Sequence, residues 1–242
     1  MKQDYTDINI VLDRSGSMQS IKDDTIGGFN AFLAEQKDVP GAATITLAQF
    51  DDVYEVVYEA LILSQAPELT GKTFVPRGST ALLDAIGRTI NTTGARLAAM
   101  DEASRPSHVI FVILTDGAEN ASQEFNAVQI NQMIQHQRDT YNWEFVFLGA
   151  NQDAITTAGR LGIQAGNAMS YAASSVGTRA AFKSVAKNMA KMRVNAAPSM
   201  AFEEVDRVAQ RDAGVEQNMP DAPPRKVQAS LKQKTSRQPR KR

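Results

Sequence analysis

Two largely apolar runs constrain the fold of this 242-residue chain more than any other feature. They are Ile8–Leu12 and Val109–Leu114, and each is typical of a buried strand. Strand-like and helix-like patterns alternate along the rest of the sequence. This alternation predicts an α/β fold, in which a mostly parallel sheet is covered by helices on both faces.

The expected elements can be placed along the chain. Strands are expected at residues 7–13, 43–50, 53–63, 109–116, 143–149 and 168–171, and helices at 23–37, 81–100, 125–140, 152–161, 174–195 and 199–213. Only Asp51 and Asp52 separate the second strand from the third. Because this gap is too short for a parallel crossover, these two strands should form an antiparallel hairpin. The pair Gly27-Gly28 should weaken the first helix, and close packing of that helix against the sheet would explain it.

Side-chain oxygens follow the predicted strands in three loops. Carboxylate and hydroxyl oxygens are the ligands that a hard cation such as Mg²⁺ prefers. Each loop alone would also be an ordinary turn, since Asp, Ser and Gly are common in turns. All three together, in this order, favour a metal site at one edge of the sheet. The motifs are Asp13-x-Ser15-x-Ser17, Thr80 in Gly78-Ser79-Thr80, and Asp116 in Thr115-Asp116-Gly117.

These five positions together resemble the metal-ion-dependent adhesion site (MIDAS) of von Willebrand factor A (vWA) domains. The resemblance covers about residues 5–195 and is closest to stand-alone intracellular domains of bacteria and bacteriophages, including the TerY-like domains of tellurite-resistance systems. It implies a doubly wound, Rossmann-like sheet of six strands in the order 3-2-1-4-5-6, with one antiparallel edge strand. We expect a vWA domain at 1–197, a helical extension at 198–217 and a basic, disordered tail at 218–242.

The resemblance also implies a role for each motif residue. Ser15 and Ser17 bind the cation through their hydroxyls, and Thr80 binds it directly or through water. Asp13 and Asp116 act largely through ordered waters and hydrogen bonds. The expected cation is Mg²⁺, with Mn²⁺ and Ca²⁺ as alternatives, and it keeps one water that a carboxylate can replace.

The implied function is that of a non-enzymatic adaptor. The metal would capture an Asp or Glu of a partner protein within a larger intracellular assembly, and an assembly with an AAA-type ATPase is one candidate. No run of about 20 apolar residues suggests a membrane span, and the first residues lack the apolar core of a secretory signal. The absence of cysteine excludes disulfides and thiolate metal sites. The expected compartment is therefore the cytoplasm.

Two other functions have to be weighed. A metal-dependent phosphohydrolase could use Asp13 as its nucleophile, but the haloacid-dehalogenase pattern requires a second carboxylate where Ser15 stands. Neither a G-x-S-x-G elbow nor a phosphate-binding glycine loop is present. The tail could instead hold nucleic acid, because residues 220–242 carry eight basic side chains and one acidic one. Such binding would be weak and non-specific, since this tail has no aromatic residue to stack on bases.

Several charged residues outside the motifs have two interpretations each. Asp51 and Asp52 are either outer groups of the metal site or surface carboxylates of a hairpin. Arg77 is either a contact for an incoming carboxylate or a solvated loop arginine, while Glu119 and Asn120 are candidates for the rim of the site. A basic stripe on the helix at 174–195 is either a solvated face or a contact for an acidic group. It consists of Arg179, Lys183, Lys187 and Lys191.

Overall fold

The computed structural model describes residues 2–150 and 153–215. Its strands are β1 (Lys2–Asp13), β2 (Ala42–Phe50), β3 (Tyr54–Ile62), β4 (Pro106–Thr115), β5 (Glu144–Ala150) and β6 (Ala168–Tyr171). Its α-helices are α1 (Lys22–Asp38), α2 (Leu82–Ala98), α3 (Ala127–Tyr141), α4 (Ala154–Arg160), α5 (Ser175–Arg193) and α6 (Glu204–Asp212). Every element expected from the sequence is found. The last helix begins later than expected because Glu203 and Asp206 form a capping box at its start.

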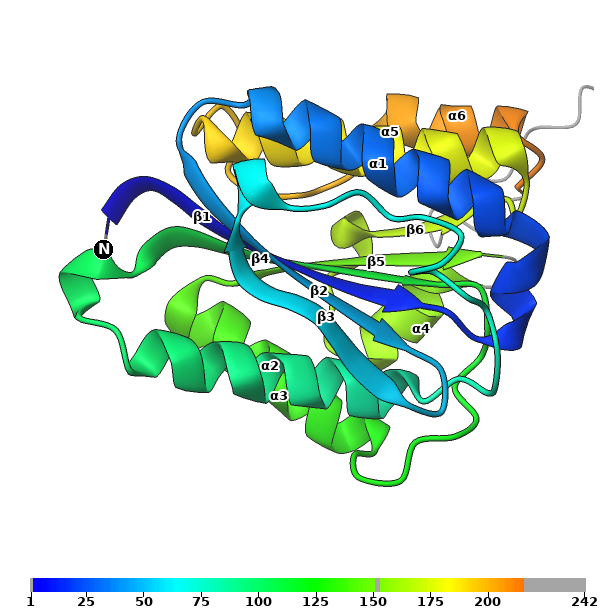
Figure 1. Ribbon diagram of the computed structural model, residues 1–242, viewed down its shortest axis with the longest axis horizontal. Helices are drawn as coiled ribbons and strands as arrows, with labels where there is room; N and C mark the ends of the chain where they lie inside the picture. Colours follow the sequence, from blue (N-terminus) through cyan, green and yellow to red (C-terminus); the bar gives the residue numbers. More distant parts are fainter. Residues whose placement is uncertain (1, 151–152, 216–242) are drawn as a thin grey trace, which may run out of the picture.

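The six strands form one sheet in the order β3-β2-β1-β4-β5-β6 (Figure 1). β2 and β3 pair in the antiparallel direction, whereas all other neighbouring strands are parallel. The predicted α/β fold, its strand order and its antiparallel edge strand are therefore confirmed.

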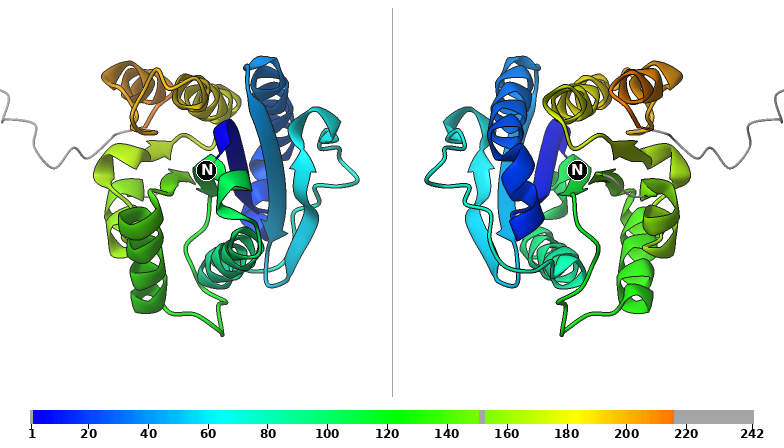
Figure 2. Two further views of the ribbon diagram at one scale, coloured as in Figure 1. Left: turned by 90° about the vertical axis from the view of Figure 1, so that its left-hand side faces the viewer. Right: turned by 90° about the vertical axis from the view of Figure 1, so that its right-hand side faces the viewer.

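Helices cover both faces of this sheet, as the end-on views of Figure 2 show. α1 and α5 pack on one face, with α6 beside α5, and α2, α3 and α4 pack on the other. Successive residues of β4 enter opposite cores: Ile110 lies in the α1–α5 core and Phe111 in the α2–α3 core. This double burial explains why Val109–Leu114 is apolar without interruption.

Gly28 allows α1 to approach α5 closely. A Cβ atom at this position would lie 2.4 Å from Cδ2 of Phe182 in α5, whereas one at Gly27 would meet no atom within 4 Å. The expected close packing is thus found at Gly28, but its partner is α5 and not the sheet. Gly27 is exposed and takes no part in this contact.

The two glycines should respond to alanine in opposite directions. Gly28→Ala should lower the free energy of unfolding by about 1–3 kcal/mol, because the added methyl group overpacks the contact with Phe182. Gly27→Ala should raise it by about 0.5–1 kcal/mol, since alanine has the better helix propensity and open space there. Urea denaturation of both variants measures the difference. Equal effects would contradict the assigned α1–α5 contact.

The basic stripe of α5 meets acidic residues of the same chain. Lys187 Nζ lies 3.0 Å from Asp206 Oδ1 and 3.1 Å from Glu203 Oε2, and Lys191 Nζ lies 2.6 Å from Glu203 Oε1. Of the two interpretations, contact with an acidic group is therefore correct for these two lysines. The acidic group comes from the start of α6, so these ion pairs fasten α6 to α5.

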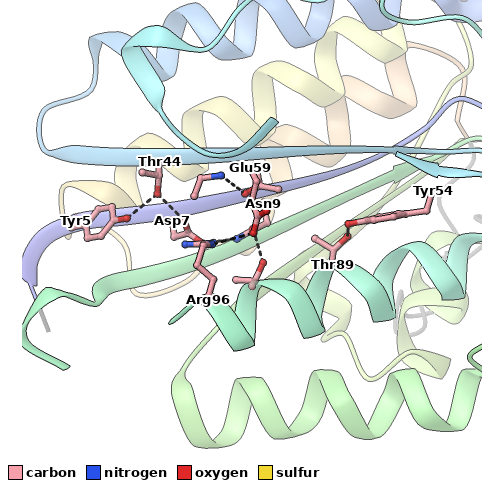
Figure 3. Close-up of polar contacts among 11 residues, drawn as sticks. Tyr5, Asp7, Asn9, Thr44, Tyr54, Glu59, Thr89 and Arg96 are labelled. Atoms are coloured by element: carbon pink, nitrogen blue, oxygen red, sulfur yellow. Dashed lines mark hydrogen bonds and ion pairs between the residues drawn. The ribbon is translucent and has the colours of Figure 1, made fainter. Parts of the chain in front are cut away.

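A buried polar network joins β1 to α2 (Figure 3). Asp7 is completely buried and accepts hydrogen bonds from Thr44 Oγ1 at 2.7 Å, Asn9 Nδ2 at 3.0 Å and Arg96 Nη2 at 2.8 Å. Asn9 Oδ1 in turn accepts a hydrogen bond from Thr93 Oγ1 at 2.9 Å. Arg96 and Thr93 belong to α2, so the network fixes the position of α2 along β1.

Across residues 2–150 and 153–215, no helix combines the length and apolarity needed to cross a membrane. The predicted tail at 218–242, with its expected disorder and nucleic-acid binding, lies outside the described residues.

Candidate metal centre

Neighbouring strands bring the first and third motifs to the same edge of the sheet. β1 and β4 are paired in parallel up to Leu12 and Leu114. Asp13 is the last residue of β1, and Asp116 follows directly after β4. The strand order reverses between these two strands. In open α/β sheets, ligands bind at this switch point, beyond the carboxyl ends of the strands.

Asp13 is buried at the bottom of the centre. Its Oδ1 accepts a hydrogen bond from the backbone N–H of Ser15 at 2.6 Å, and its Oδ2 accepts one from Thr115 Oγ1 at 2.6 Å. Burial is the main cause that raises the pKa of the Asp13 carboxyl to about 6, and the charge of Asp116 adds to it. A cation above Asp13 would favour the ionised carboxylate and offset this effect.

Three hydroxyls meet in front of Asp116. Ser15 Oγ lies 3.0 Å from Ser17 Oγ, which donates to Asp116 Oδ1 at 2.5 Å. Thr80 lies close to the same two serines, on the evidence of the space around Gly117. A Cβ atom added to Gly117 would be 2.9 Å from Thr80 Oγ1, 3.3 Å from Ser17 Oγ and 3.7 Å from Ser15 Oγ. All five motif residues are thus brought together, and glycine at 117 keeps the space between the hydroxyls clear.

Backbone hydrogen bonds hold the loop of Thr80 in place. Gly16 donates to the carbonyl of Gly78 at 3.1 Å, which joins this loop to the first motif. The side-chain oxygen of Asn120 accepts a hydrogen bond from the backbone N–H of Thr80 at 2.9 Å. The backbone N–H of Asn120 donates to the carbonyl of Thr80 at 3.1 Å. The rim residue Asn120 therefore connects the second motif to the third.

Glu119, the other rim candidate, is tied to the start of α2. Its carboxylate accepts hydrogen bonds from the N–H of Leu83 at 3.0 Å and from the N–H and hydroxyl of Ser122 at 2.8 Å and 2.7 Å. Glu119 thus anchors the helix that follows Thr80 and has no oxygen left over for a ligand role.

Asp51 forms ion pairs with two of the three loops. Its Oδ2 lies 3.1 Å from Nε of Arg14 in the first motif and 2.8 Å from Nε of Arg77 in the second. Asp51 is fully buried, so its interpretation as a surface carboxylate is wrong, whereas Asp52 is exposed. Arg77 is still about half exposed but is paired with Asp51, so it is not a freely solvated arginine.

Two features of the centre were not predicted from the sequence: the hydrogen bond of Thr115 and the ion pair between Arg14 and Asp51. The sequence pattern includes Thr115 only as part of Thr115-Asp116-Gly117, yet its hydroxyl donates to Asp13 and so links the two strand ends. A hydroxyl residue at the last position of a buried strand, where an aliphatic one is expected, was the available signal. The sequence gives no comparable signal that Arg14 is buried, because its partner, Asp51, lies in another loop.

The donor set fits a hard divalent cation. Two carboxylates and three hydroxyls supply only oxygen, as Mg²⁺ prefers, and they leave room for water in an octahedron. Over the described part of the chain, no group of three or more His, Cys, Asp or Glu side chains is placed to hold a metal ion.

No protein-family model matches the sequence, and no curated protein sequence matches it either. Solved structures do match. Proximal thread matrix protein 1 of the mussel byssus aligns with a TM-score of 0.55 at 14% identity, over 75% of this chain and 47% of that one. The same mussel protein has been solved with a zinc-occupied MIDAS motif, and that structure aligns with a TM-score of 0.52 at 13% identity, over 78% of this chain and 47% of the other.

Two bacterial pilus proteins show the same likeness. The pilus adhesin SpaC of Lactobacillus rhamnosus GG aligns with a TM-score of 0.56 at 14% identity, over 79% of this chain and 30% of that one. The vWF domain of the type V pili tip protein Mfa5 of Porphyromonas gingivalis aligns with a TM-score of 0.54 at 9% identity, over 76% and 94%. This chain spans about half the length of the mussel chains it matches. At these identities the likeness concerns the fold, and the fold of this chain is that of a vWA domain.

Proposed function

We propose that the domain is a non-enzymatic, Mg²⁺-dependent protein-binding module with a MIDAS-type centre. The observation that carries this proposal is the convergence of Ser15, Ser17 and Thr80 hydroxyls in front of Asp116. Ser15, Ser17 and Thr80 would hold the ion, while Asp13 and Asp116 would balance its charge. When bound, the ion supplies an electrophilic position at which a carboxylate can replace water.

This chain's own residues determine how such an ion would behave. Only two carboxylates face it, and the three hydroxyls add no negative charge, so a divalent ion would keep affinity for a third carboxylate. Asp51 and Asn120 fix the loops that carry the hydroxyls. An Asp or Glu of a partner protein is therefore the ligand class that we propose.

The non-enzymatic part of the proposal is supported by the surroundings of Asp13. A nucleophilic carboxylate needs a free oxygen aimed at the substrate, but both oxygens of Asp13 accept hydrogen bonds inside the protein. The zinc-occupied motif of the mussel protein and the adhesin role of SpaC support a metal-dependent interaction. We extend the proposal to an adaptor of the intracellular, TerY-like type, acting in the cytoplasm within a larger assembly such as one with an AAA-type ATPase.

A divalent ion and a small carboxylate test this function without knowledge of the partner. Mn²⁺ should bind the protein at one site, and addition of acetate should then lower the water-proton relaxation enhancement, because the carboxylate replaces coordinated water. The double variant Ser15→Ala/Ser17→Ala should lose both effects, since it removes two of the three converging hydroxyls. Mn²⁺ titration followed by relaxation measurements gives both quantities.

Ser79→Ala is the matched control. Ser79 lies beside Thr80 on the same loop and is exposed, so loss of its hydroxyl should leave Mn²⁺ and acetate binding unchanged. Mn²⁺ binding that is insensitive to acetate would contradict the capture of carboxylates. Complexes isolated with the unmutated domain as bait should also dissociate in chelator, and complexes that survive both chelator and the double variant would contradict a metal-dependent function.

A further inference from the structure

Tyr171 ends β6 with a hydroxyl that has no hydrogen-bond partner among the described residues. The side chain is completely buried in the α1–α5 core. Within the described residues, two tyrosine hydroxyls are buried and unpartnered, those of Tyr171 and Tyr58. Buried hydroxyls in proteins are almost always satisfied by protein or by ordered water. Each of these two therefore needs an explanation, and only Tyr171 lies near the metal centre.

The register of the sheet places Tyr171 in line with Asp116. Thr115 of β4 pairs with Gly149 of β5, so Asp116 is level with the next residue, Ala150. Ala150 pairs with Tyr171. The intervening residue has a small side chain and belongs to the same core as Tyr171. A tyrosine side chain is long enough to extend over it toward the strand ends that carry the centre.

The two tyrosines also differ in the charges that surround their hydroxyls. Burial, together with the charges of Asp116 and Asp13, raises the pKa of the Tyr171 hydroxyl well above its ordinary value. For Tyr58, burial alone raises the pKa. The Tyr171 hydroxyl is therefore a neutral O–H donor within electrostatic range of both carboxylates, whereas Tyr58 is not coupled to them.

We propose that Tyr171 is a positioning residue of the metal centre, whose hydroxyl donates through an ordered water to the carboxylate of Asp116. This inference rests on the function proposed above. A donor on the core side would hold Asp116 in the orientation that Ser17 fixes from the solvent side. It would do so without adding negative charge, so the ion would stay open to a partner's carboxylate.

Tyr171→Phe and Tyr58→Phe form a matched pair that tests the proposal. Tyr58→Phe removes a buried hydroxyl without a partner, so this variant should be at least as stable as the unmutated protein in urea denaturation. Tyr171→Phe loses one water-mediated hydrogen bond and should still fold. Tyr171→Phe should nevertheless weaken Mg²⁺ and Mn²⁺ binding about tenfold, whereas Tyr58→Phe should leave it unchanged. A purely structural role for Tyr171 would change stability and leave metal affinity alone.

A second readout uses the unmutated chain, in case Tyr171→Phe does not fold. The protein has five tyrosines, so labelling with 3-fluorotyrosine gives a small set of fluorine resonances, in which Mg²⁺ should shift that of Tyr171 and not that of Tyr58. Equal metal affinity of Tyr171→Phe and unmutated protein, or an unshifted Tyr171 resonance, would overturn the inference and leave the proposed function standing. Failure of the unmutated protein to bind either ion would overturn both.

Discussion

Asp13→Asn should lower the affinity of the domain for Mg²⁺ by about 10- to 100-fold. Asp13 supplies one of the two negative charges that face the proposed ion, and asparagine keeps its shape without the charge. One of the two hydrogen bonds, from the N–H of Ser15 or the hydroxyl of Thr115, can still form. The fold should therefore persist while metal binding weakens, which titration calorimetry with MgCl₂ measures.

The pH dependence of stability in the metal-free protein tests the role of Asp13 independently, because its direction can be predicted. Because the pKa of Asp13 is raised from 3.8 to about 6, the folded state binds the proton more tightly than the unfolded state. Asp13 therefore makes the metal-free protein lose stability as the pH rises through this interval, by at most about 3 kcal/mol. At pH 7.5 Asp13→Asn should be at least as stable as the unmutated protein, and this pH-dependent loss should disappear.

Asp52→Asn is the control for this prediction. It removes the carboxylate of an exposed residue in the turn between β2 and β3, so calorimetry should show unchanged Mg²⁺ affinity. Full Mg²⁺ affinity in Asp13→Asn would show that the charge of Asp13 is dispensable, and the centre would then need another explanation.

Arg96→Met should be strongly destabilising, although it lies outside the metal centre. It leaves the completely buried Asp7 without the guanidinium that lies 2.8 Å from Oδ2, although the hydrogen bonds from Thr44 and Asn9 persist. Removing one partner of a buried ion pair strands the other charge, and we expect a loss of about 3 kcal/mol in the free energy of unfolding at neutral pH. Denaturation in urea measures it.

A second substitution and a control separate charge from packing. Adding Asp7→Asn to Arg96→Met should recover most of the stability, because the stranded charge is then removed. Arg88→Met breaks an ion pair on the same helix, with Glu124, in which both side chains are largely exposed, so it should have only a small effect. If Arg96→Met and Arg88→Met lower the free energy of unfolding equally, the polar network between β1 and α2 contributes little to stability.

The sequence was sufficient for the parts of the fold that local patterns determine. Apolar runs located β1 and β4, and the two-residue gap at Asp51 and Asp52 identified the antiparallel hairpin. The five motif residues could be grouped because each follows or precedes a predictable element. Parallel strands bring such positions to a common edge, so their meeting follows from the topology.

What the sequence could not reveal depends on partners far away along the chain. Asp51 lies in a turn, where carboxylates are usually solvated, and only the approach of Arg14 and Arg77 from two other loops accounts for its burial. The contact of Gly28 with Phe182 joins two helices, α1 and α5, that are far apart in the sequence. No local pattern distinguishes these residues from ordinary turn and helix positions.

Gly117 has a consequence for how this domain can evolve. Any glycine codon becomes an alanine codon by a single nucleotide change, and the one carbon that it adds would stand 2.9 Å from Thr80 Oγ1, among the three hydroxyls. A lineage could thus abandon the proposed cation dependence in one step while both cores stay intact. Descendants of this chain should therefore divide at this position, with glycine retained only where selection still acts on ion capture.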